Sequence, residues 1–166
     1  MNSASNVNKA KGRELMRKWK APLLFALILW SAGSALPAIS ADVIELLVVA
    51  HGTPDSVVDV GKKGPAAGDL NLWSMTLFDG KEKEQVGTDS GYCVRVSATE
   101  PVRQCSFTLK LKSGSVYVTA TQTGKNGPFE GGIIGGTGEY ANARGEVKYS
   151  PNEDFTKWTY NLRISK

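Results

Sequence analysis

Strand-sized runs of alternating apolar and polar residues follow Ala41, with turn signals between them and almost no helical period. Such runs, bounded by Gly, Pro, Asn, Asp and Ser, are typical of β-strands. Turn segments such as "DGKEK", "GKNG" and "SPNED" separate them. The pattern predicts strands near residues 43–51, 70–79, 85–97, 103–112, 116–123, 129–134, 140–149 and 155–164.

Eight strands with short connections favour an antiparallel barrel or sandwich. A closed eight-stranded barrel removes exposed sheet edges and can just hold a small ligand. We therefore predict an all-β fold, a single eight-stranded antiparallel β-barrel. The long segment 52–69 is predicted to be a loop at one mouth.

The two cysteines fall on predicted neighbouring strands. A hairpin centred near Thr99 puts Cys93 opposite Cys105, within reach of a disulfide that contributes about 3 kcal/mol in the chain-entropy model. The alternative is that Cys93 stays free and reactive. Alternation places one apolar set on the same face, taken as inward: Gly91, Cys93, Arg95, Cys105, Phe107, Leu109 and Leu111.

The first 41 residues have the order of a secretory signal peptide, with basic residues, then "APLLFALILW", then small residues. We expect a signal-peptide helix in residues 1–41, cleavage after Ala41 with Ala38 and Ala35 as alternative sites, and one barrel domain in residues 42–166. The alternative is a retained membrane anchor, although a spanning helix needs about 20 apolar residues. Export to an oxidising compartment agrees with a disulfide, so we expect a secreted or periplasmic protein.

Cleavage changes the charge of the protein. The whole chain has 20 Lys and Arg against 16 Asp and Glu, a formal net charge of +4. Residues 1–41 hold six of the basic residues and one of the acidic ones, which leaves 14 basic and 15 acidic residues and a net charge of −1. We therefore expect no nucleic-acid partner, and no membrane partner after cleavage.

The segment "IIGGTGEYANARGEV", residues 133–147, could be a nucleotide-binding loop or a bend between strands. A dinucleotide site needs a helix after the glycines and a surrounding parallel β-α-β unit. Here Gly145, Val147 and Tyr149 alternate like a strand instead. The glycines are therefore interpreted as a barrel bend or bulge, and no cofactor is expected.

The usual catalytic constellations are missing. His51 is the only histidine, so no metal site is predicted. His51 itself is either a structural or solvated residue, or a proton carrier at the mouth of a pocket. No pair of carboxylates can be assigned to acid and base roles.

Two stretches resemble a known superfamily. "GDLNLWSMTLFDGKEKEQVGTDSGYCVRVS" is similar to the corresponding part of allene oxide cyclases, and "IIGGTGEYANARGEVKYS" is similar to both those cyclases and dirigent proteins. The likeness covers roughly residues 44–165. It implies an eight-stranded antiparallel barrel, often a homotrimer, whose lumen binds an apolar or phenolic small molecule.

The resemblance also assigns residues. Cyclases of this type use a Glu, an Asn and a Cys in the pocket, and these correspond here to Ala50, Met75 and Cys93, with His51 adjacent to the first. A lumen Tyr corresponds to Gln122.

In dirigent proteins a pocket Arg corresponds to Arg144, while their acidic partners fall near Ser74 and Met75. The alternative for Arg144 is a polar strand face that meets water.

Three hypotheses follow: an exported isomerase or cyclase that fixes one conformer in its lumen, a ligand carrier or stereochemical guide, and a structural barrel with a filled core. Whether the protein is an enzyme stays open. Candidate catalytic residues are Cys93, Arg144 and His51. The predicted ligand pocket consists of Trp73, Met75, Cys93, Phe107 and Gln122.

Overall fold

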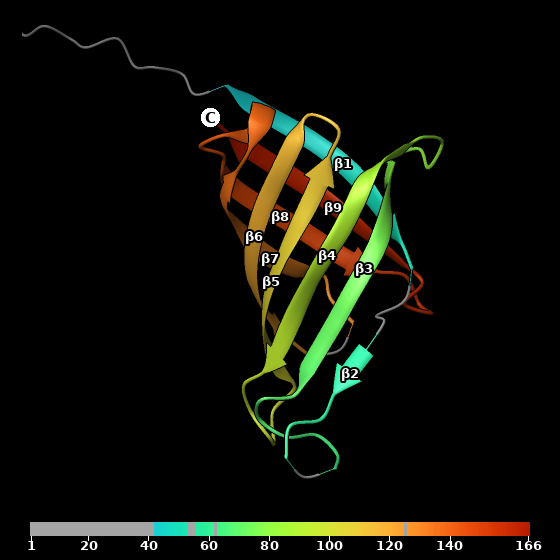
Figure 1. The fold of residues 1–166 in the computed structure, drawn as a ribbon, viewed down its shortest axis with the longest axis vertical. Helices are drawn as coiled ribbons and strands as arrows, with labels where there is room; N and C mark the ends of the chain where they lie inside the picture. Colours follow the sequence, from blue (N-terminus) through green and yellow to red (C-terminus); the bar gives the residue numbers. More distant parts are fainter. Residues whose placement is uncertain (1–41, 53–55, 62, 125) are drawn as a thin grey trace, which may run out of the picture. The chain divides into compact units, whose positions relative to one another are not determined.

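Nine strands and one short 3₁₀ turn form the fold in the computed structural model, which describes residues 42–52, 56–61, 63–124 and 126–166 (Figure 1). In chain order they are β1 (Val43–His51), β2 (Ser56–Val58), β3 (Leu70–Asp79), β4 (Gln85–Arg95), β5 (Val102–Leu111), β6 (Gly114–Thr123), β7 (Phe129–Gly136), η1 (Gly138–Tyr140), β8 (Arg144–Pro151) and β9 (Lys157–Ser165). The predicted signal peptide, residues 1–41, lies outside the described residues. Within the described ranges, no helix is long and apolar enough to span a membrane.

The sheet closes on itself. The strand order is β1-β9-β8-β7-β6-β5-β4-β3-β2, and β1 also pairs with β3, with Val48 opposite Asp79 and His51 opposite Thr76. All the neighbouring strands pair antiparallel. Eight strands therefore form a closed antiparallel barrel, which confirms the predicted fold.

The segment predicted as a loop contains an additional strand. β2 pairs with the first residues of β3, where β1 no longer covers them, and Val58 lies opposite Leu70 (Figure 1). All three residues of β2 are exposed, so the sequence shows no alternation that could reveal the strand. The prediction of a continuous loop over 52–69 was wrong at this point.

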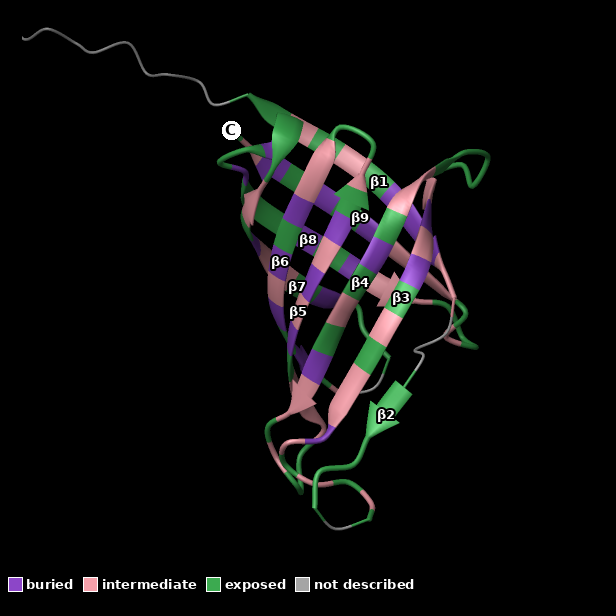
Figure 2. Cartoon of the chain, viewed as in Figure 1, coloured by how far each residue is buried: buried purple, intermediate pink, exposed green. Residues whose placement is uncertain are grey.

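The core fills one end of the barrel. Leu77, Leu109, Val116 and Ile164 are each 0% exposed and lie toward the end that carries the β3–β4 and β5–β6 turns. Figure 2 shows buried positions alternating with exposed ones along the strands, as expected when one face of each strand points inward. Toward the end near β2 the buried positions become fewer.

The clustered glycines mark a close approach between backbones. A Cβ atom on Gly136 would lie 2.3 Å from the carbonyl oxygen of Tyr140 and 2.5 Å from that of Ser115. Gly138 has φ of 60°, in the left-handed region that favours glycine. The glycines therefore bend the chain against the β5–β6 turn, and the three-residue turn η1 follows them instead of a phosphate-binding helix.

Strand boundaries near this bend differ from the prediction. The strand predicted over 140–149 begins at Arg144, because Tyr140 belongs to η1 and Asn142 has φ of 64°. Similarly, β9 begins at Lys157 instead of residue 155, since Phe155 has φ of 59°. A positive φ interrupts the extended conformation that a strand needs.

The predicted disulfide is confirmed: Cys93 on β4 is bonded to Cys105 on β5, and the two are register partners. Two residues earlier on β4, Gly91 lies opposite Phe107. A Cβ atom on Gly91 would lie 2.4 Å from the Phe107 Cβ atom. Glycine at this position therefore gives the Phe107 ring room inside the barrel.

Candidate functional site

A cavity of about 350 Å³ occupies the end of the barrel where β3 and β5 begin. Its lining residues come from β3, β4, β5, β6, β8 and β9, together with the β6–β7 and β8–β9 connections. The volume is at the lower end of the range of small-molecule sites, about 300 to 1,000 Å³. The barrel interior is thus packed at one end and hollow at the other.

Half of the twelve residues that line the cavity are aromatic. The six that line it are Trp73, Phe107, Tyr149, Phe155, Trp158 and Tyr160. The Tyr149 ring lies with its centroid 5.4 Å from that of Phe107 and 5.6 Å from that of Tyr160, to which it is nearly parallel. Rings packed against one another in this way present rigid apolar surfaces, which suit a flat or aromatic ligand.

A buried carboxyl group lies behind this wall. Asp89 on β4 is 0% exposed, and its Oδ2 atom accepts a hydrogen bond of 2.7 Å from the Tyr160 hydroxyl. Among the described residues, neither its Oδ1 atom nor the Trp73 indole nitrogen makes a hydrogen bond of normal geometry, although the Trp73 N–H lies near enough to Asp89 to lower the pKa of the carboxyl. Buried polar atoms normally have a hydrogen-bond partner, so this carboxyl is an unusual group for a barrel interior.

Burial raises the pKa of the Asp89 carboxyl from its ordinary value of 3.8 to about 6. The Tyr160 hydroxyl and the Trp73 indole N–H act in the opposite direction. The pKa of Tyr160 is raised well above 10, first by burial and then by the charge of Asp89. At neutral pH the pair therefore consists of a carboxylate and a neutral hydroxyl, a combination that can accept or relay a proton.

A second polar contact lies on the cavity wall. Gln122 on β6 donates a hydrogen bond of 3.2 Å from its Nε2 atom to the hydroxyl of Tyr149 on β8. Burial raises the pKa of Tyr149, which keeps its hydroxyl neutral. Gln122 thereby fixes the orientation of the hydroxyl of Tyr149, a residue that lines the cavity.

The structure brings together all five residues of the predicted ligand pocket. Trp73, Met75, Cys93, Phe107 and Gln122 line the same cavity. Their role in binding a ligand stays a prediction.

The three candidate catalytic residues do not come together. Cys93 lines the cavity but is held in the disulfide, so it offers no thiol. Arg144 is exposed, and its Nη1 atom donates to the carbonyl oxygen of Ala143 at 2.7 Å.

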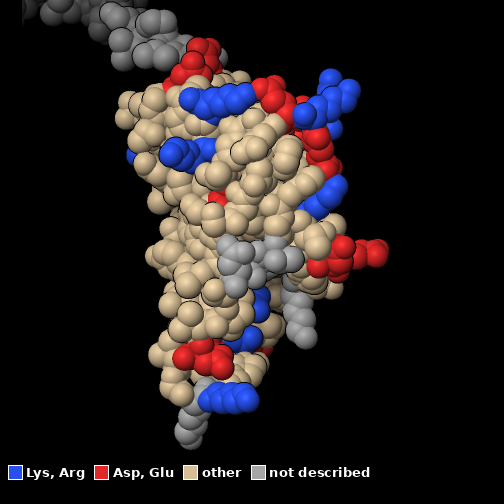
Figure 3. Space-filling view, turned by 45° about the vertical axis from the view of Figure 1, so that its right-hand side comes forward, with Lys and Arg blue, Asp and Glu red and all other residues tan. Residues whose placement is uncertain are grey.

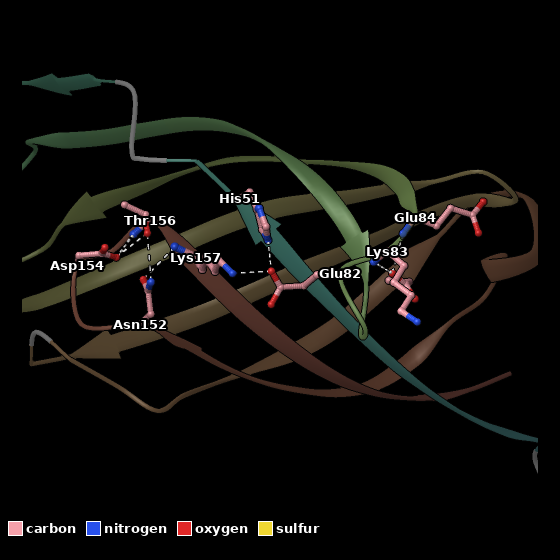
Figure 4. Close-up of polar contacts among 9 residues, drawn as sticks. His51, Glu82, Lys83, Glu84, Asn152, Asp154, Thr156 and Lys157 are labelled. Carbon is pink, nitrogen blue, oxygen red and sulfur yellow. Dashed lines mark hydrogen bonds and ion pairs between the residues drawn. The ribbon is translucent and has the colours of Figure 1, made fainter.

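His51 faces the outside of the barrel. Its Nε2 atom lies 2.7 Å from Glu82 Oε2, which Lys157 Nζ contacts from the other side at 2.6 Å (Figure 4). The His51 ring also packs against Phe78, with 4.6 Å between the centroids. Among the described residues, the cavity lining does not include His51 or Arg144.

The sequence prediction missed Asp89 and Tyr160. Asp89 comes two residues before Gly91, so alternation already placed it on the inward face. An acidic residue at an inward position is unusual and could have been singled out. The contact with Tyr160 could not, because 71 residues separate the two in the sequence.

No group of three or more His, Cys, Asp or Glu residues within the described ranges could hold a metal ion. Aromatic rings line the cavity, and the Asp89–Tyr160 pair lies next to them.

No protein-family model matches the sequence, and no curated protein sequence matches it significantly. Solved structures do match. A pyocyanin demethylase has 29% sequence identity and a TM-score of 0.64, and the match covers 73% of this chain and 99% of that one. A pterocarpan synthase dirigent protein has 19% identity and a TM-score of 0.63, covering 85% of this chain and 98% of that one.

A third match is the Diels Alderase AbmU from Streptomyces koyangensis, with 12% identity and a TM-score of 0.57, covering 78% of this chain and 70% of that one. At these low identities, the dirigent protein and the Diels Alderase show a shared fold only. The three proteins are named as a demethylase, a synthase of the dirigent type and a Diels Alderase.

Proposed function

Because this chain has the barrel of the allene oxide cyclase and dirigent-like superfamily, we propose that it binds an aromatic or phenolic small molecule in its cavity and holds it in one reactive conformation. The observation that carries the proposal is the cavity of about 350 Å³ with six aromatic rings in its wall. Holding a reactive conformer can lower a barrier appreciably without further groups. The names of the similar structures support a small-molecule substrate.

The proposed reaction is an isomerisation with proton transfer. Tyr160 lines the cavity and its hydroxyl donates to Asp89, which is not among the lining residues, so in this proposal Asp89 acts through Tyr160. As a substrate C–H or O–H bond breaks, its proton passes to the Tyr160 oxygen while the Tyr160 proton passes to Asp89. The return of a proton to another substrate atom restores both groups, and no other reactant is consumed.

The second candidate function is a carrier or stereochemical guide without catalysis. The disulfide favours this second function. Cys93 is the one cysteine among the described residues that line the cavity, and the disulfide leaves it without a free thiol. Both functions need the same ligand site and differ only in the role of Asp89.

Ligand binding is tested with the neutral fluorophore phenylnaphthylamine. We expect saturable binding that quenches the tryptophans in the wall, Trp73 and Trp158. Met75→Trp, which adds a bulky ring to the wall, should abolish binding, and Lys110→Gln on the exposed outer face should leave it unchanged. Equal binding by the wild type and Met75→Trp would contradict a lumen site.

Proton transfer is tested with phenylacetone, a neutral aromatic ketone with labile C–H bonds. We expect the protein to accelerate hydrogen–deuterium exchange of the ketone, with a rate that rises as pH increases through about 6, where the Asp89 carboxylate forms. Asp89→Asn and Tyr160→Phe should both remove the acceleration and its pH dependence. If both variants keep the acceleration and its pH dependence and still bind phenylnaphthylamine, the function as a stereochemical guide is favoured.

The exported homotrimer stays part of the proposal. Native mass spectrometry of the exported protein should find residues 42–166 as a trimer with a retained small molecule. Export is supported by the disulfide, which suits an oxidising compartment. An empty monomer that binds no hydrophobic probe would favour the structural barrel.

A further inference from the structure

Two arginines face each other at the mouth of the cavity. Arg95, the last residue of β4, is the register partner of Arg103 near the start of β5. Both lie two residues from a disulfide cysteine, so their side chains leave the strands on the inward face. Both are half-buried, and Arg103 lines the cavity.

Neither arginine has an anionic partner among the described residues. The Arg95 Nη1 atom donates only to carbonyl oxygens of the β4–β5 turn, at 3.4 and 3.5 Å. The carboxylate of Asp69 is near enough for Arg95 to help lower its pKa, but the backbone N–H groups of Ala66 and Val60 already donate to it. Within the described residues, Asp69 thus compensates the charge of Arg95 only from a distance, and neither arginine makes an ion pair.

Of the two arginines, Arg103 has the less favourable surroundings. Its Nε atom is buried and has no hydrogen-bond partner in the described part of the chain. Burial lowers the pKa of Arg103, and the charge of Arg95 lowers it further. Two cations directly opposite each other on a sheet repel, so an anion between them would stabilise this end of the barrel.

Figure 3 shows Lys and Arg side chains at both ends of the barrel, with acidic side chains close by. Arg103 differs because it lines the cavity, as do the amide residues Asn71, Gln122 and Asn126. Polar groups therefore gather at the mouth, and the aromatic rings extend further in.

We propose that Arg103, assisted by Arg95, binds the anionic group of the ligand, and that the ligand is an aromatic carboxylate or a similar aromatic oxyanion. The guanidinium fork matches the two oxygens of such a group. The buried Asp89 carboxylate, further inside, repels an anion and so fixes the orientation, with the aromatic body inward and the charge at the mouth. This inference rests on the proposed ligand site in the lumen.

The test compares two probes that differ by one charged group: anilinonaphthalene sulfonate and neutral phenylnaphthylamine. The wild-type protein should bind the sulfonate about tenfold more tightly than the neutral probe. Arg103→Gln should weaken sulfonate binding by about tenfold and change the affinity for the neutral probe by less than about twofold. Arg95→Gln should act in the same direction with a smaller effect, and the control Lys110→Gln, which also removes one positive charge, should change neither affinity.

Salt provides a test on the unmodified protein. Raising the ionic strength from about 0.05 to 0.5 M should weaken binding of the sulfonate but not of the neutral probe, because it screens only the charged contact. This measurement decides the question even if Arg103→Gln fails to fold.

Two outcomes would overturn the inference, and they differ in what else they overturn. If both probes bind with equal affinity, and neither Arg103→Gln nor salt separates them, the anion site is wrong while the lumen site stands. If neither probe binds the wild-type protein, the lumen site is wrong as well, and the proposed function falls with it.

Discussion

Replacing Asp89 by Asn should change how the stability of the protein depends on pH. The pKa of Asp89 is about 6 in the folded protein, against an ordinary value of 3.8 that we take for the unfolded chain. One pKa unit corresponds to about 1.4 kcal/mol, so keeping Asp89 ionised costs the folded state about 3 kcal/mol.

The sign follows from which state binds the proton. Below about pH 4 the carboxyl is protonated in both states and this cost is absent. Between about pH 4 and 6 the folded protein holds a proton that the unfolded chain has lost, so the free energy of unfolding falls as pH rises. Above about pH 6 the whole contribution of about 3 kcal/mol is gone.

The Asp89→Asn variant has no ionisable group at this position, so its free energy of unfolding should lack this dependence on pH. The new amide can still accept the Tyr160 hydrogen bond, and any cost of its buried N–H₂ group is the same at every pH. The assay is urea unfolding followed by tryptophan fluorescence from about pH 4 to 8, with the disulfide intact. Between about pH 4 and 8, the free energy of unfolding of the variant should rise by about 3 kcal/mol relative to that of the wild type.

Other carboxyls also make the stability depend on pH. The quantity to compare is therefore the difference in the free energy of unfolding between the wild type and Asp89→Asn at each pH. Backbone hydrogen bonds lower the pKa of Asp69 and Asp79, so their contribution is present at neutral pH and lost on acidification. They contribute equally to the wild type and the variant. The exposed Asp59→Asn serves as the control and should run parallel to the wild type. A wild-type and Asp89→Asn difference that stays constant over the pH range would refute the raised pKa.

Three further predictions concern the barrel itself. Replacing Cys93 and Cys105 by Ala should cost about 3 kcal/mol of unfolding free energy, measured by urea unfolding, and thiol titration of the unfolded, unreduced wild type should find no free thiol. Gly136→Ala should destabilise the protein by about 2 to 3 kcal/mol, because its Cβ atom would meet carbonyl oxygens at 2.3 and 2.5 Å; a melting temperature equal to that of the wild type would contradict the close approach. Gln122→Leu should cost about 1 kcal/mol by leaving the Tyr149 hydroxyl without its donor, and Gln122→Leu combined with Tyr149→Phe should recover most of that loss in a double-mutant cycle.

Local patterns were enough to predict most of the fold. Alternation and turn residues placed β1 and β3 at their observed bounds, and they fixed the hairpin register that joins Cys93 to Cys105. The side-chain period of a strand is two, so one correctly placed residue orients all the others on that strand. For the same reason the inward positions Trp73, Met75 and Phe107 could be predicted from the sequence.

The register of a single strand was less certain where no neighbour fixed it. The sequence left His51 open between a solvated residue and a proton carrier at the pocket mouth. In the folded barrel, Ala50 points inward and is 0% exposed, which turns His51 outward to Glu82. A shift of β1 by one residue would turn His51 from the outside of the barrel to the pocket. The pairing of β1 with both β3 and β9 fixes its register and places His51 outside.

The sequence by itself determined the eight barrel strands, the bend at the glycines, the disulfide and the inward face of the barrel strands, because these depend on residues close together in the chain or on one hairpin. Only the tertiary structure decided that one end of the lumen is hollow, since free volume depends on how side chains from all eight barrel strands fill a shared space. It also brought Tyr160 on β9 to Asp89 on β4. That contact crosses the interior of the barrel, and alternation along a strand fixes which way a side chain points but not which residue it meets on the opposite wall.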